Sequence, residues 1–249
     1  MFHYYHELRV DKYAYLGLHQ ILYIVGNKSG KTILYTINFD EGRFDTNQTY
    51  VTRLDFRLAE TDCTVNYDSG TNATTFTIPF ELSTPFVVTR GTNQGTIIPV
   101  TSSTATTVVV TGDKSSTEVF IGERYNMKYE FSEPTLKEDT SGGGRVAVAA
   151  GRLQIKHWLM RYQDSGEFEA KVESKIGGTT QQIYKFTGRL IGGGENIIGS
   201  TKLTSGDFKF PIMIKSDRAQ ITIESLSHLP CQFLSAEWEG NMHLRAKRR

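Results

Sequence analysis

The sequence has few of the residues from which proteins build metal and disulfide centres. It contains two cysteines, Cys63 and Cys231, which cannot by themselves form a disulfide framework or a four-ligand zinc site. The six histidines are scattered, without the close spacing of a metal-binding pair on a helix. There is no Gly-x-Ser-x-Gly motif, and neither cysteine has neighbours that would lower its pKa. We therefore predict no metal site, no cofactor and no catalytic residue, and a protein that is not an enzyme.

The sequence also lacks a long apolar run and an excess of charge. No apolar stretch approaches the length of a membrane span, and residues 1–11 include His3, His6, Glu7 and Arg9, where a signal peptide needs an unbroken apolar segment. The 28 lysines and arginines nearly balance the 27 acidic residues, for a net charge of +1. This balance excludes a protein whose whole surface binds nucleic acid or an anionic membrane.

What is abundant is glycine, threonine and aromatic side chains, in a chain long enough to bury a sizeable core. Its 249 residues include 23 glycines, and 38% of them are hydrophobic. Turn residues recur about every ten positions, a spacing typical of a sandwich, barrel or propeller, and no segment shows the apolar periodicity of a capped helix. The sequence therefore predicts an all-β protein made of multi-stranded sandwich-like or barrel-like subdomains.

The predicted organisation has three parts. Residues 1–45 form a β-hairpin region, residues 46–131 a sandwich-like subdomain, and residues 132–249 a β-rich C-terminal subdomain. The last boundary is a polar, Gly-rich connection that runs from Ser132 to Gly144.

Individual strands follow from the alternation of apolar and polar residues. Gln20 to Asn38 read as a hairpin. Short strands are expected at Leu54–Leu58, Thr74–Ile78, Pro85–Thr89, Thr96–Val100, Thr106–Thr111 and Glu118–Ile121. Leu153, Ile155, His157 and Leu159 are expected on one face of a strand that forms a hairpin with the strand around Phe168 to Val172. A later strand alternates Phe208, Phe210, Ile212 and Ile214, and its Pro211 favours an edge position.

Two patterns invite a chemical interpretation that the residues do not support. The segment Gly26 to Thr32 resembles a phosphate-binding loop, but it has three residues between its glycines where four are needed, and a strand follows where a helix should begin. Glu237 and Glu239 would share one face of a strand, as a glycosidase pair could. Acidic residues two positions apart are more often a solvated or salt-bridged face, and His157 on an apolar strand face is more often a core or interface residue.

The chain resembles a known family through four segments. The C-terminal SHLPCQFLSAEWEGNMHLRAKRR, Ser227 to Arg249, is similar to the end of the tail tubular protein B family, the tail nozzle of short-tailed T7-like bacteriophages. Three further segments resemble the same family: VFIGERYNMKYEFSEP at Val119–Pro134, GRLQIKHWLMRYQDSGEFEAKV at Gly151–Val172 and TTFTIPFELSTPFVV at Thr74–Val88. Family members are longer, with much of a β-propeller before the matched region. Residues 1–45 are then interpreted as a propeller remnant, and the chain as a truncated or split member or one whose propeller another chain supplies.

The resemblance implies a structural virion protein rather than a chemical activity. It implies a homo-hexameric ring that forms a tube below the tail adaptor, gives tail fibres a place to dock and conducts genomic DNA without sequence-specific binding. The protein would be made in the host bacterial cytoplasm and reside in the phage tail. A passage for DNA should be neutral or acidic, which the near-zero net charge permits.

Candidate interface residues are aromatic anchors and a basic tail. Trp158 and Trp238 could anchor contacts between subunits, with ordinary core packing as the equal alternative. The tail could contact an acidic partner or DNA phosphates through Arg245, Lys247, Arg248 and Arg249. The functional alternative is a carbohydrate-binding or adhesin-type β module that remains a monomer.

Overall fold

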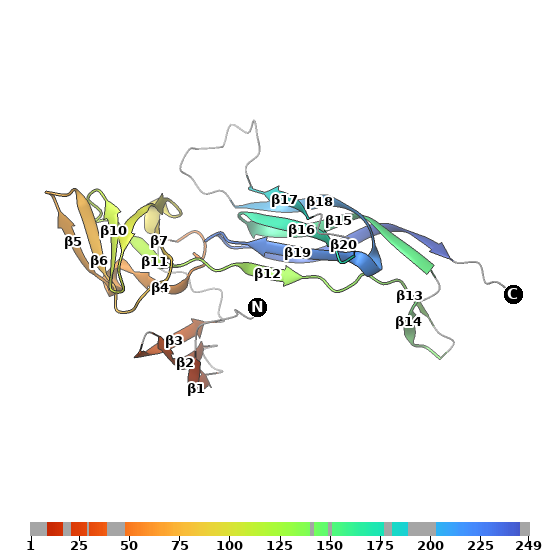
Figure 1. The fold of residues 1–249 in the computed structure, drawn as a ribbon, viewed down its shortest axis with the longest axis horizontal. Helices are drawn as coiled ribbons and strands as arrows, with labels where there is room; N and C mark the ends of the chain where they lie inside the picture. The colour runs from red at the N-terminus through yellow and green to blue at the C-terminus, as the bar shows by residue number, and fades with distance from the viewer. Residues whose placement is uncertain are drawn as a thin grey trace, which may run out of the picture. The chain divides into compact units, whose positions relative to one another are not determined.

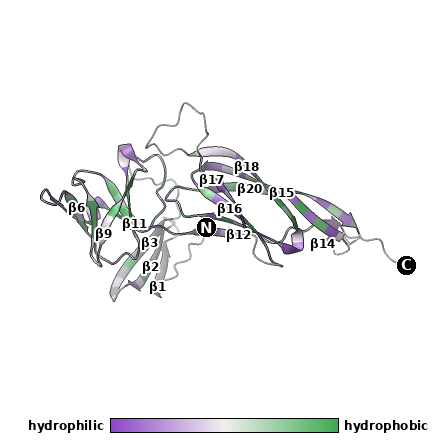
Figure 2. Ribbon diagram, turned by 45° about the horizontal axis from the view of Figure 1, so that its top comes forward, coloured by the Kyte–Doolittle hydropathy of each residue, from purple (hydrophilic) through white to green (hydrophobic). Residues whose placement is uncertain are grey.

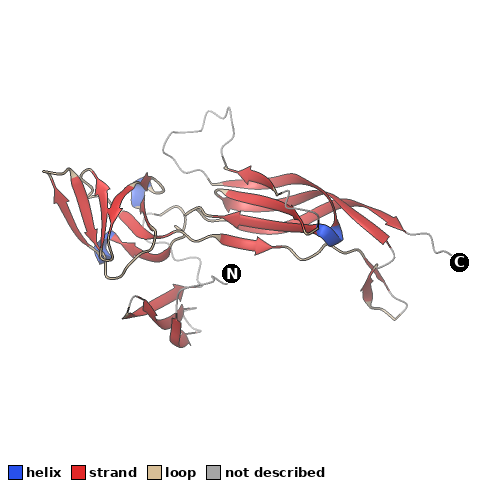
Figure 3. Cartoon of the chain, viewed as in Figure 1, coloured by secondary structure: helices blue, strands red, loops and turns tan. Residues whose placement is uncertain are grey.

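The computed structural model describes residues 9–16, 21–28, 30–38, 48–139, 142–148, 151–176, 181–188 and 203–244. These residues form antiparallel strands joined by turns and by the short 3₁₀ helices η1(Glu60–Asp62), η2(Gly91–Asn93) and η3(Ser216–Arg218) (Figures 1 and 3). The all-β prediction is confirmed. The chain divides into two compact units between Tyr125 and Asn126, ahead of the Gly-rich connection expected after Ser132. The three-part division predicted from the sequence stays a prediction.

The first described strands form a small meander. Strands β1(Arg9–Leu16), β2(Ile21–Lys28) and β3(Lys31–Asn38) pair in chain order. The hairpin predicted for Gln20 to Asn38 is confirmed, since β2 and β3 pair from Ile21 opposite Asn38 to Lys28 opposite Lys31. Gly30 adopts a φ of 77°, and its N–H donates to Oδ1 of Asn27 at 3.1 Å. The segment that resembles a phosphate loop is therefore a hairpin turn.

The rest of the first unit is a sandwich of two four-stranded sheets. Their orders are β5-β6-β10-β9 and β4-β11-β7-β8. The strands are β4(Asp55–Ala59), β5(Thr64–Asp68), β6(Ala73–Thr77), β7(Pro85–Thr89), β8(Ile97–Ile98), β9(Val100–Ser103), β10(Thr107–Thr111) and β11(Val119–Glu123). Phe76 and Val108 of one sheet and Val87 and Ile121 of the other are fully buried in one core. Five of the six expected strands are present as single strands. The strand expected at Thr96–Val100 is instead divided between β8 of one sheet and β9 of the other, and β5 is an additional strand.

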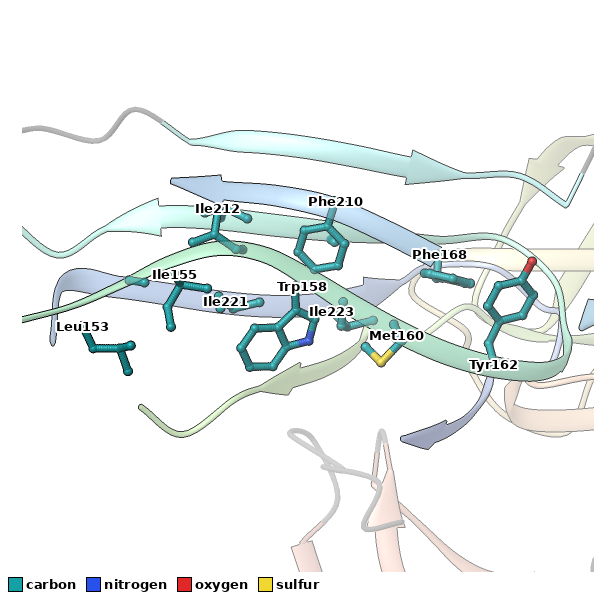
Figure 4. Packing of buried hydrophobic residues seen from close by; sticks show 13 residues of the cluster. Leu153, Ile155, Trp158, Met160, Tyr162, Phe168, Phe210, Ile212, Ile221 and Ile223 are labelled. Carbon is teal, nitrogen blue, oxygen red and sulfur yellow. The ribbon is translucent and has the colours of Figure 1, made fainter. Parts of the chain in front are cut away.

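The second unit is a longer sandwich with a separate hairpin. Its sheets run β12-β19-β16-β17 and β18-β15-β20, and β13 pairs with β14 alone among the described strands. The strands are β12(Met127–Glu130), β13(Lys137–Asp139), β14(Arg145–Ala147), β15(Gly151–Ser165), β16(Phe168–Ser174), β17(Gln182–Phe186), β18(Thr204–Lys215), β19(Ala219–Ser225) and β20(Gln232–Leu244). Hydrophilic and hydrophobic residues alternate along these strands (Figure 2). The apolar sides of both sheets share one core, in which Trp158, Phe210 and Ile221 lie (Figure 4).

The hairpin predicted between Leu153 and Val172 is wrong in its pairing. Both strands exist, as β15 and β16, but β15 pairs with β18 and β20, whereas β16 pairs with β17 and β19. The turn at 166–167 therefore carries the chain from one sheet of the sandwich to the other. Period-two alternation indicates that each strand has one buried face, but it does not say which strand lies beside it.

A bulge in β15 also corrects the expected apolar face. Ile155 lies opposite Gly240 and His157 opposite Glu239, so Lys156 is an extra residue on β15. The buried face consequently continues through Trp158, Met160 and Tyr162, while His157 and Leu159 face outward. One inserted residue moves every later side chain to the opposite face, and His157 is not part of the core.

Strand β18 lies at an edge of its sheet, which confirms the position predicted from Pro211. Its buried residues Phe210 and Ile212 alternate with exposed ones, as the sequence indicates. At the level of the β15 bulge, β18 also carries an extra residue, and Met213 there has a φ of 55°. Aromatic pairs close the sandwich between β17 and β18, with ring centroids of Tyr184 and Phe210 separated by 5.6 Å.

Candidate interaction surfaces

The outer face of the β18-β15-β20 sheet carries the acidic pair singled out in the sequence. Glu237 lies opposite Leu159 and Glu239 opposite His157, so both glutamates share this face, as predicted. Nδ1 of His157 lies 3.8 Å and Nζ of Lys209 lies 3.7 Å from Oε2 of Glu239. The next ion pair joins Nε of Arg161 to Oδ1 of Asp207 at 3.1 Å. The arrangement is a solvated, ion-paired sheet face.

The outer face of the other sheet holds a tighter charge network. Lys128, Glu224, Glu169 and Lys185 form one row across β12, β19, β16 and β17. Two glutamates directly opposite each other repel. Lys171, from the neighbouring row, lies with its Nζ 2.6 Å from Glu224 and 3.2 Å from Glu169 and so joins the two carboxylates.

The protonation equilibria of this network reflect its partial burial. Burial raises the pKa of Glu224, but hydrogen bonds from Lys171 and from Nδ2 of Asn126 outweigh it, so the pKa lies below its ordinary value. The hydrogen bond to Glu224 raises the pKa of Lys171. Both shifts favour the charged forms. The network therefore stabilises the sheet while its members remain ionised.

The first unit contains a comparable ion pair between Glu60 of η1 and Arg90. Nε of Arg90 donates to Oε2 of Glu60 at 2.8 Å, and the N–H of Val119 donates to the same oxygen at 2.9 Å. The guanidinium of Arg90 also lies 5.7 Å from the centroid of the Phe120 ring. This pair ties η1 to β7 and β11. Burial raises the pKa of the nearby Cys63 to about 11, so its thiol is not an activated nucleophile.

The two tryptophans proposed as interface anchors face the interior of the second sandwich. Trp158 is 4% exposed, and its ring lies 4.9 Å from that of Phe131. Trp238 lies opposite Trp158 on β20 and packs, half-buried, against the same core. Trp158 is thus a core residue of the single chain, whereas the side chain of Trp238 is partly exposed and available for contact with another molecule. The basic tail Arg245, Lys247, Arg248 and Arg249 lies outside the described residues.

The β13–β14 hairpin presents apolar side chains that the sequence reading missed. Every residue of both strands is exposed, including Val146 at 57%, and Leu136 beside β13 is 38% exposed. Glu138 lies opposite Val146, and the N–H of Val148 donates to the carbonyl oxygen of Leu136. Leu136, Glu138, Val146 and Val148 therefore share one face. The alternation was present in the polar connection after Ser132 but was too short to stand out.

Two kinds of feature are absent from the part of the chain that the structure describes. No group of three or more histidine, cysteine or acidic side chains there is arranged to hold a metal ion. No helix in the described part of the chain has the length and hydropathy to cross a bilayer.

Comparison with known proteins decides the family. Residues 8–249 match the profile of the bacteriophage nozzle protein family. The chain belongs to the bacteriophage nozzle protein family. It is also 24% identical over 229 residues to tail tubular protein gp12 of Escherichia phage T7, a match that covers 88% of this chain. The chain spans about 28% of the length of that relative.

This nozzle-family membership fits what the two sandwiches present. The two outer sheet faces of the second sandwich carry ion pairs, Trp158 lies in its core, and Trp238 packs half-buried against that core. The family places the protein among structural components of the phage tail, and its relatives are structural proteins rather than enzymes.

Proposed function

We propose that this chain is a subunit of a phage tail nozzle, in which identical copies form a homo-hexameric ring around a passage for the genome. The family match over residues 8–249 carries this proposal. The chain contacts the tail adaptor and the tail fibres, and it is made in the host cytoplasm before it joins the virion.

The charge of the chain supports a role as a conduit. Cations that neutralise DNA phosphates release counterions and hold the duplex, so a passage lined by them would slow ejection. The net charge of +1 and the ion pairs of Arg161 and Lys171, one on each outer face of the second sandwich, limit such attraction to DNA. DNA then passes without sequence-specific binding.

The contacts between subunits require surfaces that the isolated chain leaves exposed. Trp238 is a candidate anchor because it is only half-buried, and the basic tail Arg245, Lys247, Arg248 and Arg249 is a candidate for an acidic partner. Trp158 contributes by holding the sheet on which Trp238 lies.

Quantitative mass spectrometry of purified virions tests this function. We expect the chain in purified tails, at six copies for each tail, and labelling of a C-terminal tag at the tail tip in electron micrographs. Absence of the chain from the particles would overturn the proposal. A monomer that binds glycans and is absent from tails would instead favour the carbohydrate-binding alternative.

A further inference from the structure

The β13–β14 hairpin has no core of its own. It has two strands of three residues, all exposed, and its exposed ion pair between Arg145 and Asp139 lies on the face that also carries Lys137. An isolated two-stranded hairpin is at best marginally stable in water, and exposed ion pairs add little. Its opposite face, with Leu136, Val146 and Val148, is apolar. A hairpin of this kind gains stability when that face is covered.

Strand β18 also exposes an apolar residue, Met213, in an unfavourable backbone conformation. Met213 is 56% exposed and has a φ of 55°, in the left-handed region that bulky residues rarely adopt. Ile212, its neighbour, is buried in the core, so the bulge turns Met213 away from the sandwich. A hydrophobic residue held outward at a conformational cost is an indication of contact with a partner.

The charges around these two patches are complementary. The face of the hairpin carries one charged group, the carboxylate of Glu138. The surroundings of Met213 carry cations, because Arg152 and Lys156 lie on the adjacent part of β15. The carboxylate of Glu239 on β20 already lies beside His157 and Lys209. The apolar face of the hairpin, with its one carboxylate, is therefore complementary in charge to the region of Met213, with its cations.

We propose that the β13–β14 hairpin of one copy docks on the Met213 region of β18 in a second copy. Leu136, Val146 and Val148 cover Met213, and Glu138 faces the cations beside it. The donor and acceptor are different surfaces of the same chain, so the contact is heterologous and propagates from copy to copy until the ring closes. This inference rests on the proposed nozzle function and names the interface that the ring uses.

Substitutions at adjacent exposed residues of β14 test the donor side. Val146→Asn places an uncharged amide on the apolar docking face, whereas Ala147→Asn places one on the opposite face. Both positions are exposed, so neither change disturbs a core. We expect Val146→Asn to lower the assembled fraction in analytical ultracentrifugation by at least tenfold, because it buries an amide in an apolar contact, and Ala147→Asn to leave it unchanged. Equal assembly of both variants overturns the docking proposal.

Met213→Asn tests the acceptor side and separates docking from folding. Asparagine tolerates a positive φ better than methionine, so the melting temperature of the chain should stay equal or rise while assembly falls. A parallel loss of melting temperature and assembly would assign Met213 a structural role only, against the proposal. A mixture of Val146→Cys and Met213→Cys chains should form intermolecular disulfides under mild oxidation that neither variant forms alone. Absence of this mixed disulfide also contradicts docking.

The wild-type chain separates this inference from the proposed function. If the wild type assembles and Val146→Asn assembles equally, the hairpin is not the interface, although the nozzle proposal stands. If the wild type remains a monomer at every concentration and no mixed disulfide forms, self-assembly and the docking contact both fail.

Discussion

Nζ of Lys171 lies 2.6 Å from Oε2 of Glu224 on the outer face of the β12-β19-β16-β17 sheet. The side chain of Glu224 is 12% exposed and that of Lys171 is 21% exposed, so the pair is largely removed from water. Nζ of Lys171 also lies 3.2 Å from Glu169, the residue of β16 that is directly opposite Glu224 of β19. Lys171 thus joins β16 to β19 at the point where two carboxylates lie opposite each other.

Lys171→Met should destabilise the second unit by about 2–3 kcal/mol, because it leaves two opposed carboxylates with too little positive charge. Chemical denaturation monitored by tryptophan fluorescence reports this unit through Trp158 and Trp238. Lys209→Met is the matched control, since Lys209 is 54% exposed and its carboxylate partner lies 3.7 Å away. The control should cost at most about 0.5 kcal/mol. Equal losses would contradict the importance of the Lys171 network.

The depressed pKa of Glu224 predicts acid sensitivity. A carboxyl whose folded-state pKa lies below its unfolded value contributes stability above that unfolded value, and the contribution is lost as pH falls through the folded pKa. The free energy of unfolding should therefore decline as pH drops below about 4.5, the ordinary value for glutamate. Glu224→Gln should be less stable at pH 7 and show a shallower decline below pH 4.5. An unchanged slope would mean that Glu224 is not a source of this dependence.

Gly240→Ala should destabilise the sheet at the β15 bulge. A Cβ on Gly240 would lie 2.5 Å from the carbonyl oxygen of Gln154, so the backbone must shift. We expect a cost of about 1–3 kcal/mol in the free energy of unfolding. Gly142→Ala serves as the control because nothing lies within 4 Å of its Cβ. A neutral Gly240→Ala would show that the close approach at the bulge does not constrain the sheet.

Substitutions of the two tryptophans should lower the free energy of unfolding by different amounts. Trp158→Ala removes a buried ring and should cost about 3–5 kcal/mol, whereas Trp238→Ala, at a half-buried site, should cost about 1–2 kcal/mol. If Trp238 lies at a contact between copies, its substitution also lowers assembly. A Trp238→Ala chain that assembles like the wild type would remove Trp238 from the candidate interface residues.

The sequence predicted the strands better than their partners. Alternation at Phe208 to Ile214 identified β18, and Pro211 placed it at an edge, because proline lacks the N–H that a central strand needs. Alternation also located β15 and β16. Their pairing, however, depends on strands that lie elsewhere in the sequence: β18 and β20 for β15, and β17 and β19 for β16. The bulge at Lys156 could not be anticipated, since the apolar residues on both sides of it fit period two when read separately.

The sequence predicts less about the candidate interaction surfaces than about the strands. The sequence favours neither a core position nor an interface position for Trp158, and only the burial of its ring assigns it to the core of the chain. Met213 is an apolar residue at a position of β18 where the alternation predicts a polar one. This signal becomes informative only when Ile212 is known to face the core. Lys171 and Glu224 lie more than fifty residues apart in sequence, and only the register of β16 and β19 brings them together.

The solution mass of the purified chain, measured by multi-angle light scattering and accompanied by negative-stain images, tests the central claim most directly. The account predicts a closed ring of six 28.0 kDa subunits with a central hole. A particle of 28.0 kDa at all concentrations, with and without the other tail proteins, would contradict it.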